Sequence, residues 1–311
     1  MRVVVAGTPE VAVPTLDALM ASEHEVVAVL TRPDAPLGRK RIMTPSPLAA
    51  RAEALGVPIL KSAKPDEEVI RQLRELGVEL GVVVAYGALL TQPVLDAIPH
   101  GWVNLHFSAL PKWRGAAPLQ RAVMAGERTS ALTVFQLEAG LDTGPIFKST
   151  PVDLDPTKTS GELLADFAVT GADLVVDVVD GIASAALVAV PQVGEPTHAA
   201  KLTRDDGHID WHREAWLVSS QVRGVTPEPG ARALLGEDWL KIHEIADAAD
   251  ARIELAPGEL GIVAKRIFVG TATTPIELLR VQPAGKQAMT AMDWWRGMST
   301  RLAEGDRVTL A

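Results

Sequence analysis

Residues 103–118 read Val-Asn-Leu-His-Phe-Ser-Ala-Leu-Pro-Lys-Trp-Arg-Gly-Ala-Ala-Pro. An apolar, strand-like run carries an amide and an imidazole here, Asn104 and His106, two residues apart. Alternate side chains of a strand point to the same face, so these two groups share one side. At the carboxyl end of a parallel strand, that side opens into the crevice where α/β proteins bind ligands. The stretch therefore predicts an α/β fold with a site at this strand end.

A carboxylate follows downstream in the turn Gly140-Leu141-Asp142-Thr143-Gly144. An amide, an imidazole and a carboxylate together can polarise a carbonyl, move a proton and orient the imidazole. His106 is the natural proton shuttle, because an unperturbed imidazole has a pKa of about 6.5. A lone histidine at a strand end is more often structural, but Asn104 beside it and Asp142 downstream favour catalysis.

Short β-like runs alternate with helical stretches through the first half of the chain. Strands are expected at 2–6, 25–30, 58–60, 80–85, 101–106, 131–137 and 146–152. Helices are expected at 11–21, 47–55, 66–76, 91–97, 119–125 and 160–182. This alternation predicts a doubly wound, Rossmann-like parallel sheet.

The second half has a different pattern. Residues 191–207 contain Pro and Gly without periodicity and are expected to form a linker. A helix is expected next at 213–222, followed by short β-like runs at 240–245, 258–264, 267–271 and 276–282, a pattern typical of a small β-barrel. A chain of 311 residues is long enough for two domains, here 1–190 and 208–311.

Composition excludes several classes of protein. The chain has no cysteine, which excludes disulfides, thiol catalysis and thiolate metal sites. Its seven histidines show no metal-ligand spacing, so no metal is expected. No apolar run approaches the roughly 20 residues of a membrane span, and the first strand is too short for a signal-peptide core. We therefore expect a cytoplasmic protein without a membrane partner.

The charge pattern bears on nucleic-acid binding. A net charge of −9 argues mildly against such a partner, because phosphate neutralisation needs clustered Lys and Arg. A local cluster, Arg39-Lys40-Arg41, nevertheless lies in the unusually long connection 31–47. These three side chains could grip RNA phosphates or form a solvated loop.

The motifs resemble those of the 10-formyltetrahydrofolate-dependent formyltransferases. The resemblance rests on the Asn-x-His pair at 104–106, the Ser-x-Leu-Pro-x-x-Arg-Gly-Ala-Ala-Pro run at 108–118 and the Leu-Asp-Thr-Gly turn at 141–144. Weaker matches extend it nearly end to end, from Ala-Gly-Thr-Pro at 6–9 to Gln-Pro-Ala-Gly-Lys at 282–286. Within the family, the chain is similar to the members that formylate the methionine carried by initiator tRNA.

The resemblance implies a reaction, a co-substrate and a set of site residues. Asn104 would polarise the formyl oxygen of 10-formyltetrahydrofolate, His106 would shuttle the proton, and Asp142 would orient His106, without a metal. The resemblance also implies an OB-like barrel for the second domain. Ala109 stands where the family usually has Leu. The family's folate-contacting positions correspond to Ser108, Ala109, Leu110, Pro111, Val84, Tyr86 and Gly87.

The acceptor implied is the α-amino group of methionine on initiator tRNA, bound by a monomeric enzyme. Arg39, Lys40 and Arg41 would then meet the acceptor end of the tRNA, with Lys40 where the family usually has Gly. The same chemistry could serve a sugar nucleotide, glycinamide ribonucleotide or water. An NAD-linked dehydrogenase is disfavoured because residues 6–9 lack Gly-x-Gly-x-x-Gly. A non-catalytic RNA-binding module is the remaining alternative.

Overall fold

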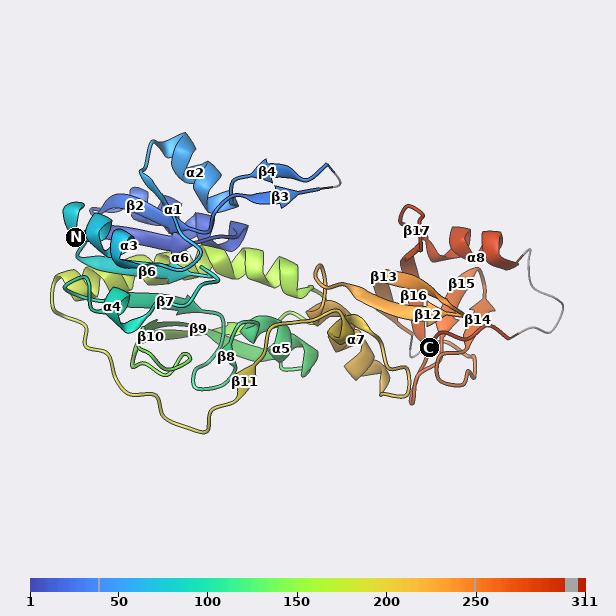
Figure 1. The fold of residues 1–311 in the computed structure, drawn as a ribbon. Coiled ribbons are helices and arrows are strands. Elements are labelled where there is room, and N and C mark those ends of the chain that lie inside the picture. The colour runs from blue at the N-terminus through green and yellow to red at the C-terminus, as the bar shows by residue number, and fades with distance from the viewer. Residues whose placement is uncertain (39, 249, 300–306) are drawn as a thin grey trace. The chain divides into compact units, whose positions relative to one another are not determined.

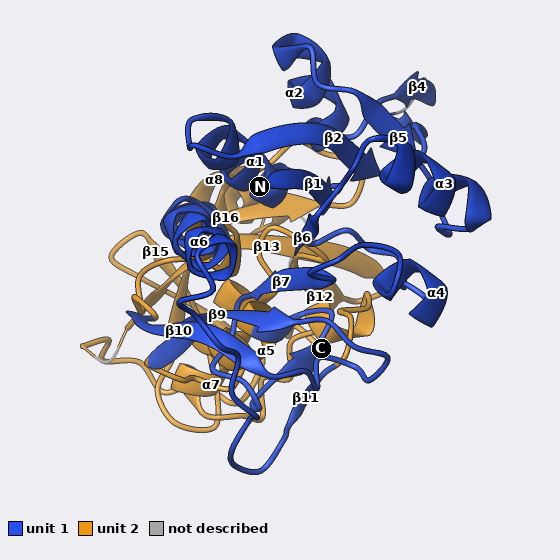
Figure 2. Ribbon diagram, turned by 90° about the vertical axis from the view of Figure 1, so that its left-hand side faces the viewer, with its two compact units in different colours: residues 1–118, 129–153, 164–199 blue, residues 119–128, 154–163, 200–311 orange. Residues whose placement is uncertain are grey.

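The structure is a computed structural model that describes residues 1–38, 40–248, 250–299 and 307–311 (Figure 1). By packing, the chain divides into two compact units (Figure 2). Unit 1 gathers residues 1–118, 129–153 and 164–199, and unit 2 gathers 119–128, 154–163 and 200–311. Each unit therefore combines separate stretches of the chain. The expected domain limits at 190 and 208 stay a prediction.

Unit 1 is built on a seven-stranded sheet in the order β10-β9-β7-β6-β1-β2-β5. Its strands are β1 (Arg2–Gly7), β2 (Glu25–Thr31), β5 (Ile59–Lys61), β6 (Leu80–Val84), β7 (Trp102–His106), β9 (Thr129–Gln136) and β10 (Ile146–Asp153). The five strands from β7 to β5 pair in parallel, which confirms the expected α/β fold with a central parallel sheet. The last two strands depart from the parallel pattern, because β9 runs antiparallel to β7 and β10 antiparallel to β9.

The helices of unit 1 lie between its strands along the chain, except α6, which follows the last strand of the sheet (Figure 1). They are η1 (Glu10–Ala12), α1 (Val13–Met20), α2 (Pro47–Leu55), α3 (Glu67–Glu75), α4 (Gln92–Leu95) and most of α6 (Ser160–Ala183). Helix α2 shows why these segments begin and end where they do. The Ser46 side chain accepts the Ala49 N–H, Pro47 occupies the first helical position, and Gly56 ends the helix with φ +71°. The expected helix 47–55 is confirmed at both ends.

Tight packing between β6 and β7 positions the strand that carries the Asn-x-His motif. All five residues of β6 are buried, as in strands covered on both faces. A Cβ atom at Gly81 would fall 2.1 Å from the ring of Trp102, so only glycine fits there. The Trp102 ring is fully buried, and its Nε1–H donates to the Val94 carbonyl at 2.9 Å. These contacts fix the start of β7 against its neighbour.

Two connections contain strands where the sequence predicts a loop or a linker. The long connection 31–47 forms a hairpin of β3 (Ala35–Leu37) and β4 (Ile42–Thr44). Within the expected linker, β11 (His198–Ala199) pairs in parallel with β8 (Arg114–Gly115). Both β8 and β11 belong to unit 1, so this part of the linker packs beside the motif at 103–118.

Unit 2 is dominated by an antiparallel sheet in the order β12-β13-β16-β15-β14, with β17 beside β16. The strands are β12 (Ala231–Leu235), β13 (Asp238–Asp247), β14 (Leu260–Val263), β15 (Arg266–Val269), β16 (Ile276–Pro283) and β17 (Met289–Thr290). Its helices are α5 (Pro118–Met124), η2 (Asp205–Gly207), α7 (Ala215–Gly224) and α8 (Ala291–Ser299). No helix among the described residues is long and apolar enough to cross a membrane.

The end of the chain joins the two edges of this sheet. Ala311 N–H donates to the Leu234 carbonyl of β12 at 2.8 Å. Leu260 N–H of β14 donates to the Val308 carbonyl at 2.9 Å, and Leu310 N–H donates to the Gly258 carbonyl at 2.8 Å. Because residues 308–311 bond to both edges, the sheet closes on itself, as a β-barrel requires. The expected second, smaller β-domain is confirmed, and its sheet is antiparallel.

Candidate active site

The carboxyl end of β7 carries both polar groups of the Asn-x-His motif. In β7, Asn104 pairs with Val83 of β6 and with Phe135 of β9, and His106 pairs with Thr133 of β9. Asn104 and His106 are two residues apart on one strand, so their side chains share a face. This strand end lies at the edge of the parallel sheet where ligands bind in α/β proteins.

The His106 ring is held by contacts on two sides. Its side chain is 5% exposed, and its Nε2 lies 3.0 Å from the Trp113 carbonyl oxygen. A carbonyl can only accept, so Nε2 carries the ring proton and Nδ1 keeps its lone pair when the imidazole is neutral. The Phe135 ring packs edge-on against the imidazole with the centroids 6.1 Å apart.

The structure brings the Asp142 carboxylate next to the free nitrogen of this imidazole. Asp142 Oδ2 lies 3.8 Å from His106 Nδ1, and the Asp142 side chain is 12% exposed. The same oxygen accepts the Gly115 N–H at 2.7 Å. Asp142 has φ +51°, a backbone conformation that is uncommon for a residue other than glycine. The distance to Nδ1 is too long for a hydrogen bond but short enough for strong attraction to an imidazolium.

The surroundings shift the pKa of His106 in a direction that suits a base. Burial lowers the pKa of His106 from its ordinary value, and Asp142 and the Trp113 carbonyl raise it in part. The net shift is downward, so the imidazole is neutral near pH 7 and Nδ1 can accept a proton. A proton on Nδ1 would place a positive charge opposite the Asp142 carboxylate.

The loop after β7 is held by a side chain of its own and by a side chain of β9. The Ser108 hydroxyl donates to the Lys112 carbonyl at 2.7 Å, and the Thr133 hydroxyl donates to the Ser108 carbonyl at 2.7 Å. Ser108 is fully buried, and its predicted contact with folate stays a prediction. Leu110 and Pro111 are also buried, which leaves Ala109 as the more exposed residue of the four at 108–111.

The second predicted ligand-contacting segment follows β6. Val84 is buried in the sheet, and Tyr86 is 1% exposed with its hydroxyl donating to the Ser62 carbonyl at 2.7 Å. Burial raises the pKa of Tyr86 to about 12. Gly87 is exposed with φ +76°, and its carbonyl accepts from Arg32 Nη1 at 2.7 Å. Of the three predicted residues, Gly87 is therefore the one that offers an accessible backbone.

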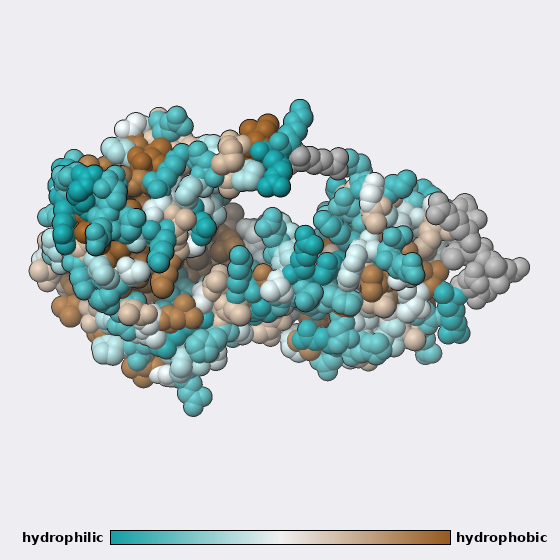
Figure 3. Space-filling view, viewed as in Figure 1, coloured by the Kyte–Doolittle hydropathy of each residue, from teal (hydrophilic) through white to brown (hydrophobic). Residues whose placement is uncertain are grey.

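The predicted basic cluster falls in the turn of the β3–β4 hairpin. Arg39 lies outside the described residues, whereas Lys40 and Arg41 are exposed. The hairpin also exposes apolar side chains, with Leu37 67% and Ile42 62% exposed. Figure 3 shows apolar surface over this hairpin beside hydrophilic atoms. An exposed hairpin of this mixed character is suited to contact with a partner.

Part of the site comes from residues that sequence reasoning treated as a linker. Gln192 hydrogen-bonds to the backbone of the Asp142 turn and to the Arg114 side chain. The Thr197 hydroxyl accepts the Trp113 N–H at 2.8 Å. No periodicity or charge pattern marks these two residues. Only their spatial neighbours reveal them.

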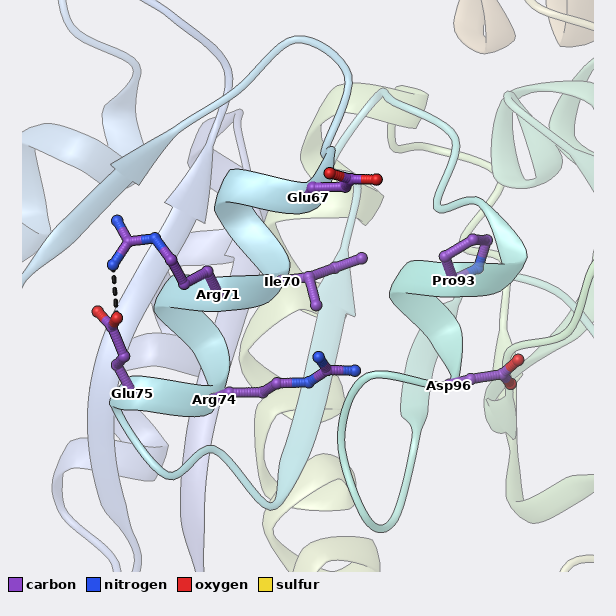
Figure 4. Close-up of a pocket in the computed structure, with 7 residues that line it drawn as sticks. All are labelled: Glu67, Ile70, Arg71, Arg74, Glu75, Pro93 and Asp96. Atoms are coloured by element: carbon purple, nitrogen blue, oxygen red, sulfur yellow. Dashed lines mark hydrogen bonds and ion pairs between the residues drawn. The ribbon is translucent and has the colours of Figure 1, made fainter.

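A surface hollow of about 600 Å³ lies between α3 and α4 (Figure 4). Charged side chains line it, and Arg71 is already paired with Glu68 and Glu75. Figure 4 shows the Arg74 side chain reaching from α3 toward α4, whereas the Asp96 side chain points away from α3. None of the predicted site residues lines this hollow, so the candidate active site is elsewhere, at the end of β7.

A metal would need more ligands than the site brings together. His106 and Asp142 supply one imidazole and one carboxylate. In the part of the chain that the structure describes, no group of three or more His, Asp and Glu side chains could hold a metal ion. The absence of a metal from the reaction stays a prediction.

Comparison with known proteins places the chain among formyl transferases. Residues 1–179 match the formyl transferase family, and residues 201–299 match the formyl transferase C-terminal domain. The methionyl-tRNA formyltransferase of Clavibacter sepedonicus is 52% identical over 301 residues, covering 97% of this chain and 98% of that protein.

Solved structures show the same fold at low sequence identity. An N-formyltransferase from Helicobacter canadensis, solved with folinic acid and dTDP-3-aminofucose, aligns with a TM-score of 0.67 and 15% identity. The alignment covers 91% of this chain and 99% of that one. The methionyl-tRNA formyltransferase from Clostridium thermocellum aligns with a TM-score of 0.58 and 16% identity, covering 81% and 95% of the two chains.

Proposed function

Because this chain belongs to the formyl transferase family, and within it to the methionyl-tRNA formyltransferases, we propose that it formylates the methionine on initiator tRNA. The donor is 10-formyltetrahydrofolate, and the acceptor is the α-amino group of methionine. The observation that carries this proposal is the placement of Asn104, His106 and Asp142 at one strand end. These residues supply an amide, a base and a carboxylate for acyl-type transfer to an amine.

The reaction begins when the amine nitrogen attacks the formyl carbon and a new C–N bond forms. The carbonyl oxygen becomes an oxyanion, to which the Asn104 amide donates a hydrogen bond. Such a donor typically contributes about 10²- to 10³-fold to the rate. The amine proton goes to His106 Nδ1, since Nε2 already donates to the Trp113 carbonyl.

Collapse of the tetrahedral intermediate breaks the bond between the formyl carbon and N10 of the folate. The His106 imidazolium returns its proton to N10, so protons balance and tetrahydrofolate leaves. Asp142, 3.8 Å from Nδ1, stabilises the imidazolium between these two steps. Proton transfer by a positioned group typically contributes about 10²- to 10⁴-fold.

Donor binding is assigned to the two loops that follow β6 and β7. The exposed backbone at Gly87 and the loop at 108–111 flank the carboxyl end of the sheet, where the formyl group must reach Asn104. The smaller Ala109 provides less apolar contact area than Leu. Each Å² of apolar contact area that is lost reduces the favourable free energy of binding by about 25 cal/mol.

Acceptor binding is assigned to the β3–β4 hairpin through Arg39, Lys40 and Arg41. Lys40 and Arg41 are exposed and free to approach phosphates. The monomeric state and the cytoplasmic location stay predictions.

The test is transfer of radiolabelled formyl from 10-formyltetrahydrofolate to methionyl-initiator tRNA, with methionyl-elongator tRNA in parallel. The His106→Ala variant is the control for chemistry. Labelling of the initiator species by the wild-type chain supports the proposal. Release of formate without labelled tRNA would instead assign a hydrolase, and transfer to an amino sugar nucleotide would assign a different acceptor.

A further inference from the structure

The segment that follows α6 contains one side chain that differs from its neighbours. Between residues 191 and 198 every side chain is exposed except that of Gln192, which is half-buried. The next residue, Val193, is 88% exposed. An amide that is drawn in from an otherwise exposed segment must have partners that compensate for its lost hydration.

Gln192 uses its full hydrogen-bonding capacity. Its Nε2 donates to the Asp142 and Gly144 carbonyl oxygens, both at 2.8 Å. Its Oε1 accepts from Arg114 Nε at 3.2 Å and from Arg114 Nη2 at 2.7 Å. Exchange of the amide oxygen and nitrogen would set donor against donor and acceptor against acceptor, so only this orientation satisfies all four contacts. All of these residues belong to unit 1.

The two segments joined by Gln192 are those that hold the Asp142 carboxylate. Arg114 precedes Gly115, whose N–H donates to Asp142 Oδ2 at 2.7 Å. The turn on the other side has little apolar anchorage, because Leu141 is 61% exposed. Asp142 itself has a positive φ, which persists only where surrounding contacts maintain it. The hydrogen bonds of Gln192 are such contacts.

We propose that Gln192 is a positioning residue of the active site, which joins the Asp142 turn to Arg114 and so keeps the Asp142 carboxylate beside His106 Nδ1. This inference rests on the proposed function for the reaction that it serves. Gln192 does not contact His106 itself, so its effect passes through Asp142. A displacement of about 1 Å in a catalytic group can cost up to about 10²-fold in rate.

Kinetics of Gln192→Ala test the proposal, with Val193→Ala as the matched control on the neighbouring exposed residue. We expect the kcat of Gln192→Ala to fall about 10-fold or more, with KM for methionyl-tRNA within about twofold of wild type. We expect Val193→Ala to behave as wild type. Equal losses in both variants, or a change confined to KM, would overturn the proposal.

Gln192→Glu separates the two halves of the contact. One carboxylate oxygen can still accept from Arg114, but the other would face the Asp142 and Gly144 carbonyls without a proton to donate. We expect Gln192→Glu to lose at least as much activity as Gln192→Ala. Retention of wild-type activity would show that the Asp142 turn does not need the amide.

Two further measurements distinguish positioning from general structural support. In an Asp142→Asn background, Gln192→Ala should lower kcat by less than about twofold, because the carboxylate through which Gln192 acts has lost its charge. An NMR titration of His106, assigned with a His106→Gln variant, should show a lower His106 pKa in Gln192→Ala than in wild type. The proposal would be contradicted if the kcat loss of the double variant equalled the product of the two single losses, or if the His106 titration were unchanged in Gln192→Ala.

These measurements also separate failure of the inference from failure of the proposed function. If the wild-type chain does not formylate methionyl-tRNA, the proposed function fails. The NMR titration still decides whether Gln192 places Asp142 beside His106, since it needs no substrate. Circular dichroism and thermal unfolding confirm that each variant is folded.

Discussion

Replacement of Asp142 by Asn isolates the electrostatic role of the carboxylate. The asparagine side chain keeps an oxygen that can accept the Gly115 N–H, so the turn retains that contact. The change therefore removes the negative charge 3.8 Å from His106 Nδ1 with little change in shape.

The distance and burial of this pair set the size of the effect. Two unit charges 3.8 Å apart attract by about 4 kcal/mol at an effective dielectric constant of about 20, and by about 1 kcal/mol in bulk water. The two side chains are 5% and 12% exposed, which favours the upper part of this range. Loss of the charge should lower the pKa of His106 further, because Asp142 is a group that raises it.

The sign of the pH effect follows from which form of His106 reacts. Neutral His106 accepts the proton, so activity rises with pH through the pKa of His106. With Asn at position 142 that pKa is lower, and the acidic limb of the kcat/KM profile should move to lower pH. The rate on the plateau should fall about 10- to 10³-fold, because the imidazolium loses about 1 to 4 kcal/mol of stabilisation.

The assay is the pH dependence of formyl transfer to methionyl-initiator tRNA. Asp177→Asn is the matched control, since Asp177 is 59% exposed and pairs with Lys148 on the surface. An acidic limb that stays in place together with a plateau within threefold of wild type would refute the role assigned to Asp142.

Three other predictions address the oxyanion, the acceptor and the core. Asn104→Ala should lower kcat by about 10²- to 10³-fold with the fold intact by circular dichroism, and near-normal turnover would remove Asn104 from the mechanism. The double variant Lys40→Ala/Arg41→Ala should weaken tRNA binding while sparing folate binding. The slope of log binding constant against log salt concentration should become shallower by an amount that corresponds to up to about two phosphate contacts, and an unchanged slope would place the RNA contact elsewhere. Gly81→Ala should destabilise the chain by about 1–3 kcal/mol in urea unfolding, because its Cβ would fall 2.1 Å from the buried Trp102 ring. Gly297→Ala is the control for that change, since its Cβ meets no heavy atom within 4 Å, and equal stability of the two variants would contradict the packing argument.

Local patterns in the sequence were sufficient to predict many of the strands and helices of unit 1. The apolar runs of β1, β2 and β6 predict buried strands because parallel strands covered on both faces lack alternation. The helix 47–55 could be predicted at both ends because Ser46, Pro47 and Gly56 act within one turn of the helix. The shared face of Asn104 and His106 follows from strand period alone.

Contacts between residues far apart in the sequence decided the direction of β9 and the closure of the barrel. The antiparallel direction of β9 depends on pairing with β7, and barrel closure depends on residues 308–311 meeting Leu234 and Leu260. Neither leaves a periodic signal, because hydrogen bonds between backbones are almost independent of side-chain type.

For the candidate active site, too, some features could be predicted from the sequence and others depend on tertiary structure. The sequence by itself determined the chemical groups, since an amide, an imidazole and a carboxylate in these motifs indicate proton transfer at a carbonyl. Only the tertiary structure decided how the groups are held. His106 Nε2 donates to the Trp113 carbonyl, and the Asp142 carboxylate lies 3.8 Å from Nδ1. Gln192 joins Asp142, 50 residues before it in the chain, to Arg114, 78 residues before it. The physical reason is that reactivity belongs to side-chain types, which a sequence states directly, whereas distance and burial arise only when remote segments pack together.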